Sequence, residues 1–117
     1  ILRMGAHTLI HKRTEDDIWK NLFELPLVET EKDLSEEEFL ACPQFHALFA
    51  EGEVRMVRTL LRGVKHVLSH RVIYTNFYEV TLPDNSSSFS SYQRVAVEDL
   101  GRYAVPRLIH AFLEKYV

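Results

Sequence analysis

The chain has 117 residues, a formal net charge of −3, and 46% hydrophobic and 26% charged residues. This length predicts one domain with one hydrophobic core, and the composition excludes a disordered chain. The single cysteine, Cys42, excludes an internal disulfide, an iron–sulfur cluster and a cysteine-rich zinc site within the chain. No apolar run approaches the roughly 20 residues of a membrane-spanning helix.

The first part of the chain predicts short extended segments. Residues 1–12 predict two short strands about a turn at Gly5. A polar connection over residues 13–21 follows, and then the apolar run 22–28. Pro26 lies within this run, so we expect an edge strand or an irregular extended segment there.

Three stretches predict helices. Ser35 and Glu38 have the spacing of a capping box, which predicts a helix over residues 35–41. Pro43 favours the first position of a second, short helical segment. The clearest helix is expected over residues 105–117, where apolar residues recur at helical spacing. These residues are Val105, Leu108, Ile109, Phe112, Leu113 and Tyr116.

The second half of the chain predicts most of the strands. We expect strands over residues 54–61 and 64–67 with a turn at Gly63 between them, a long strand over 71–82, and a last one over 93–97. Strands and helices in this order predict an α+β (or α/β) fold, with one mixed sheet covered by helices.

A basic segment lies within this otherwise acidic chain. Between residues 54 and 78 there is no Asp or Glu. The cations of this segment are Arg55, Arg58, Arg62, Lys65 and Arg71, accompanied by His66 and His70. One interpretation is a polyanionic partner. The other is a solvated sheet edge guarded by cations, which charge alone favours.

The chain lacks the common catalytic and metal-binding motifs. There is no GxGxxG, Walker, GxSxG or HExxH sequence. His66 and His70 are four residues apart, as are His7 and His11, but both pairs fall in strand-like sequence, which favours structural histidines over metal ligands. The acidic run 36–38 suits the first turn of a helix. We therefore expect no metal site.

Three stretches of the chain carry recognisable patterns: W-x-x-L-[WYF]-E-[FL]-P in residues 18–26, K-H-x-[FL]-[ST]-H in residues 65–70, and Y-A-[LV]-P in residues 103–106. Together and in this order they resemble signatures of the C-terminal domain of MutY-type A/G-specific adenine DNA glycosylases. The resemblance implies a Nudix-like domain over residues 1–117. It implies no pyrophosphohydrolase activity, because residues 30–40 lack the Gly and Arg of the hydrolase signature.

The resemblance further implies recognition of 8-oxoguanine opposite adenine in duplex DNA. The family uses a hairpin tip for this contact, which falls here on Leu68, Ser69 and His70. Ser69 would meet the polar edge that oxidation adds to guanine, and Leu68 would act as an aliphatic wedge against the base step. The residues expected to contact phosphates are Lys65, Arg71 and Arg62.

The same resemblance implies that the chain is the C-terminal piece of a longer, monomeric, bacterial cytoplasmic enzyme. Its partners would be DNA and its own N-terminal helical domain, which would excise the adenine and hold an iron–sulfur cluster. The piece itself is expected to be non-catalytic and free of cofactors. Two alternatives stay open: a free-standing Nudix-type hydrolase of a modified nucleotide, and a protein-interaction module that uses residues 19–28.

Overall fold

The computed structural model describes residues 1–17, 19–50 and 52–116. Its strands form two three-stranded sheets, whereas the sequence predicts one. The first sheet is mixed and has the order β1 (Leu2–Arg3), β5 (Val72–Thr81), β4 (Met56–Val67), with β1 parallel to β5. The second is antiparallel and has the order β3 (Phe23–Glu24), β2 (His7–Lys12), β6 (Gln93–Ala96).

The three predicted helical stretches are present, and the α+β fold class is confirmed. They are α1 (Glu36–Ala41), α2 (Pro43–His46) and α3 (Arg107–Tyr116). A 3-10 helix, η1 (Val97–Arg102), follows β6. The predicted capping box of α1 is present, with the Ser35 side chain accepting from the Glu38 N–H. No helix in the described ranges is long and apolar enough to cross a membrane.

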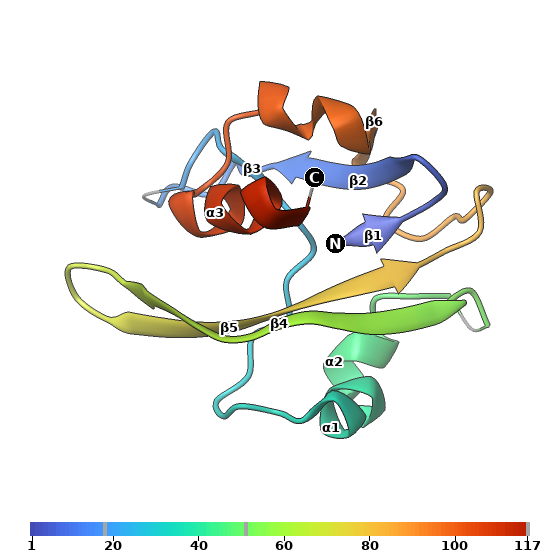
Figure 1. Ribbon diagram of the computed structural model, residues 1–117. Helices are drawn as coiled ribbons and strands as arrows, with labels where there is room; N and C mark the ends of the chain where they lie inside the picture. The colour runs from blue at the N-terminus through green and yellow to red at the C-terminus, as the bar shows by residue number, and fades with distance from the viewer. Residues whose placement is uncertain (18, 51, 117) are drawn as a thin grey trace.

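The β4–β5 hairpin separates the two sides of the molecule. Figure 1 shows α1 and α2 on one side of it, and α3 with the second sheet on the other. Successive side chains of a strand point to opposite faces. Neighbouring residues of β5 therefore contact α1 on one side and α3 on the other. The Tyr78 ring stacks on Phe39 of α1, with 4.3 Å between centroids, and the Phe77 ring stacks on Phe112 of α3 at 4.2 Å.

Strand β4 corrects the prediction of two strands with a turn at Gly63. It is one strand of 12 residues, and its register against β5 shifts between Thr59 and Leu61 and again between Leu61 and Val64. Gly63 lies inside the second irregularity with φ of +64°. Gly63 therefore adopts its positive φ in a β-bulge and not in a turn. Sequence alone does not distinguish these two positions for a glycine.

Candidate nucleic-acid interface

The end of the β4–β5 hairpin is a four-residue turn at the place that the family resemblance implies. Val67 pairs with Val72, and the Leu68 N–H donates to the Arg71 carbonyl oxygen at 2.8 Å. Ser69 occupies the apex together with His70, and both side chains are exposed, while Leu68 is half-buried. In Figure 1 this end extends past α1 and α2, away from the body of the molecule. The three residues are therefore together and accessible.

Two cations lie at this turn, Lys65 in the strand before it and Arg71 as its last residue. Lys65 and Arg71 are exposed, and neither makes a salt bridge within the part of the chain that the structure describes. Their charges are available to an external anion.

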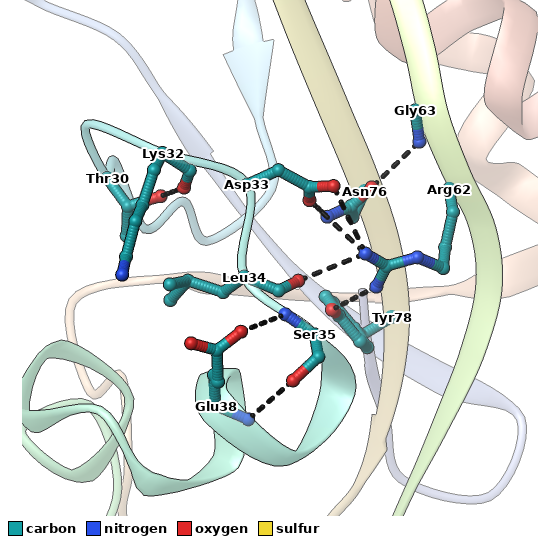
Figure 2. A network of polar contacts seen from close by, with 10 residues as sticks. All are labelled: Thr30, Lys32, Asp33, Leu34, Ser35, Glu38, Arg62, Gly63, Asn76 and Tyr78. Atoms are coloured by element: carbon teal, nitrogen blue, oxygen red, sulfur yellow. Dashed lines mark hydrogen bonds and ion pairs between the residues drawn. The ribbon is translucent and has the colours of Figure 1, made fainter.

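Arg62, the third expected phosphate contact, makes several contacts within the protein. Its Nη2 donates to both carboxylate oxygens of Asp33, at 3.2 and 3.3 Å, and to the Leu34 carbonyl oxygen at 3.1 Å. Its Nη1 lies 3.4 Å from the Tyr78 hydroxyl. Figure 2 shows these contacts converging on one guanidinium. The arginine ties the segment before α1 to the middle of the hairpin. Sequence spacing does not reveal Asp33 as its partner.

Asn76 completes this network and closes the β4 bulge. Its side-chain Nδ2 donates to Asp33 at 2.8 Å, and its Oδ1 accepts from the Gly63 N–H at 2.8 Å (Figure 2). The bulge would otherwise leave that N–H without a strand partner. The Asn76 side chain thus provides the hydrogen-bond acceptor that the Gly63 N–H needs and also holds Asp33 in place. Asp33 in turn orients Arg62.

The hairpin end also carries an exposed face that sequence reasoning missed. Val72 and Tyr74 share a strand parity with Tyr78, Val80 and Leu82. The last three are buried, but Val72 and Tyr74 are exposed. The difference arises because α1 covers only the part of the face near Tyr78. An alternating apolar pattern identifies a face, and it does not say how far along the strand that face is covered.

The acidic first turn of α1 has a structural role. Glu38 accepts a hydrogen bond from the Ser35 N–H at 3.0 Å, and this bond lowers the pKa of the Glu38 carboxyl. No group of three His, Cys, Asp or Glu side chains in the described ranges is placed to hold a metal ion. Of the histidines, His11 stacks on the Tyr92 ring at 4.9 Å.

The other two stretches that carry the family resemblance meet each other. The Phe23 N–H donates to the Ala104 carbonyl oxygen at 2.8 Å, and the Phe23 ring packs edge-on against Tyr103 at 5.0 Å. These contacts join β3 to the segment before α3, so both stretches hold the fold together. Residue Ile18, part of the first stretch, lies outside the described residues.

A family model described as NUDIX domain matches residues 1–115. No curated protein matches the chain.

Proposed function

This chain belongs to the NUDIX domain family, and on that premise we propose that it recognises 8-oxoguanine opposite adenine in duplex DNA through the end of its β4–β5 hairpin. The observation that carries the proposal is the turn of Leu68, Ser69 and His70, with Lys65 and Arg71 beside it, which make no salt bridge to described residues. A protruding turn with cations on both sides suits phosphate contacts that set register and one side chain that reads a base.

Ser69 is the residue that we assign to the lesion. Oxidation adds a carbonyl oxygen at C8 of guanine and converts N7 from an acceptor to an N–H donor. The Ser69 hydroxyl both donates and accepts, and it makes no hydrogen bond to any described residue. His70 next to it is exposed and is assigned to positioning or phosphate contact, and Leu68 to packing against the neighbouring base step.

Excision of the adenine is assigned to a separate domain of a parent enzyme. In this proposal the parent is an A/G-specific adenine DNA glycosylase, and its catalytic carboxylates and iron–sulfur cluster lie on that other domain. The chain then contributes discrimination more than affinity, because bulk affinity for DNA needs many phosphate contacts and the turn offers two cations, Lys65 and Arg71.

The test compares Ser69→Ala with the unmodified chain on duplexes that hold 8-oxoguanine:adenine or guanine:adenine. Fluorescence anisotropy at fixed salt gives each Kd, with NMR titration of labelled chain to locate the contact. We expect Ser69→Ala to reduce the preference for the oxidised duplex about fivefold, the value of roughly one hydrogen bond.

The matched control is Ser90→Ala, because Ser90 is an exposed serine of the loop between β5 and β6. It should leave both affinities unchanged. An equal loss on both duplexes in Ser69→Ala, or no loss, would contradict the assignment. Hydrolysis of oxidised dGTP by the chain with Mg²⁺ would contradict the proposed function itself.

A further inference from the structure

We infer that the hairpin has a second DNA-contacting surface, beside the turn that reads the base. This outer face consists of Lys65, Val67, Val72 and Tyr74, and its occupant is the sugar–phosphate backbone of the duplex. The inference rests on the proposed function and extends it from lesion recognition to sequence-independent binding of DNA.

The strand register places these four side chains together. Lys65 lies directly opposite Tyr74, and Val67 lies opposite Val72. Residues opposite each other in an antiparallel pair project to the same face, as do residues two apart along a strand. The four therefore form one continuous patch that begins at the turn and runs toward the body of the molecule.

The patch is exposed although three of its four side chains are large hydrophobic ones. The exposed fractions are 65% for Val67, 45% for Val72 and 68% for Tyr74. On the same face of β5, Asn76 is held by Asp33, and Tyr78 is stacked by Phe39. This face of β5 is thus covered by α1 and the segment before it as far as Asn76. Beyond Asn76, from Tyr74 toward the turn, it is not covered by them.

Charge identifies the occupant. The patch lies in the acid-free segment 54–78, and Lys65 on it and Arg71 next to it make no salt bridge to described residues. At its turn end the apolar surface is therefore bordered by cations, whereas Asp33 lies at its other end, beyond Asn76. The turn end suits a partner with apolar and anionic groups in alternation. The deoxyribose–phosphate backbone has this chemistry, with sugars to pack on the valines and phosphates to accept from the Tyr74 hydroxyl and the Lys65 ammonium.

The test uses Tyr74→Ala, Tyr74→Phe and Lys65→Gln in the purified chain, titrated with three duplexes: fully paired undamaged DNA, guanine:adenine and 8-oxoguanine:adenine. Tyr74→Ala should weaken binding to all three by the same factor of about fivefold or more. Tyr74→Phe should lose only the part of the affinity that comes from the hydrogen bond between the Tyr74 hydroxyl and a phosphate. Lys65→Gln should lower the slope of log Kd against log salt by about one phosphate contact.

Leu27→Ala is the control, because Leu27 is an exposed leucine, 59% accessible, in the segment between β3 and α1. It should leave all three affinities unchanged. Circular dichroism melting of each variant tests that the fold is intact, which we expect because all substituted side chains are exposed.

The outcomes separate this inference from the proposed function. A changed preference in Ser69→Ala with unchanged affinities in Tyr74→Ala overturns the outer face alone. The same holds if Tyr74→Ala instead weakens binding to another protein. A uniform loss in Tyr74→Ala without any effect of Ser69→Ala supports the outer face and overturns the lesion reader. No binding of any duplex overturns both.

Discussion

Glu53 accepts hydrogen bonds from three consecutive serines of the loop between β5 and β6. The Ser86 hydroxyl donates at 2.6 Å and the Ser87 N–H at 3.2 Å, and the Ser88 hydroxyl also donates. These bonds stabilise the ionised form and lower the pKa of Glu53 from 4.5 to about 2. At the scale of one residue, a single carboxylate therefore fixes an otherwise irregular serine-rich loop to the segment before β4.

The pH dependence of stability tests this role. Because the pKa in the folded chain lies below the unfolded value, Glu53 contributes stability that is fully present above pH 4.5 and is lost as the pH falls toward 2. We expect Glu53→Gln to lower the Tm at pH 7, with a difference from the unmodified chain that shrinks on acidification. Thermal melting across this pH range measures it.

The control for this measurement is Glu29→Gln, because Glu29 is exposed. It should give little change in Tm at any pH. A Tm difference for Glu53→Gln that stayed constant down to the lower end of the range would show that ionisation of Glu53 is not what holds the loop.

At the scale of elements, the bulge in β4 and the segment before α1 meet at the middle of the hairpin. Gly63 has φ of +64°, and a Cβ added there would meet no atom within 4 Å. Gly63→Ala therefore adds backbone strain without a steric clash. We expect it to lower the free energy of unfolding by about 1–2 kcal/mol, measured by urea denaturation.

Gly101→Ala is the matched control, since it also meets no atom within 4 Å and has no positive φ. It should be neutral or slightly stabilising. If both substitutions were equally tolerated, the left-handed conformation at Gly63 would not constrain the hairpin.

At the scale of the whole molecule, two hydrophobic clusters share the second sheet and the hairpin. Ile10 belongs to one cluster and Leu9 to the other, so β2 is buried on both faces. Phe112 of α3 is 3% exposed and stacks on Phe77 with an angle of 4° between rings. This contact packs α3 against the hairpin within the cluster that contains Ile10.

We expect Phe112→Ala to lower the free energy of unfolding by about 3–5 kcal/mol, because it leaves a cavity beneath α3. That is a large part of the about 5–15 kcal/mol of a typical domain. Urea denaturation measures it, with Leu27→Ala as the exposed control. A loss below about 1 kcal/mol would mean that α3 is dispensable for the core.

Local signals in the sequence predicted the local structure well. The capping box at Ser35 and the apolar spacing of residues 105–117 each depend on residues a few positions apart, and both helices are present. The turn at Leu68 to Arg71 has no glycine or asparagine, so only the family resemblance indicated it.

Contacts between distant segments could not be predicted in the same way. Asp33 lies 29 residues from Arg62, and nothing in either neighbourhood marks the pair. The exposure of Tyr74 depends on where α1 ends in space, which the strand pattern does not encode. The division into two sheets depends on which strands pair, and several of these pairs join strands that are far apart in the sequence. Predicting where the strands lie does not predict which of them pair.

The position of β4 at the outside of its sheet has a consequence for handling the chain. In the described ranges no further strand pairs with its outer edge, whose backbone groups are a template for a strand of another molecule. The bulge at Gly63 and the charges of Arg58, Arg62 and Lys65 oppose such pairing between identical copies. Removing several of these charges at once to weaken DNA binding would also remove the protection against aggregation, so single substitutions are the safer design.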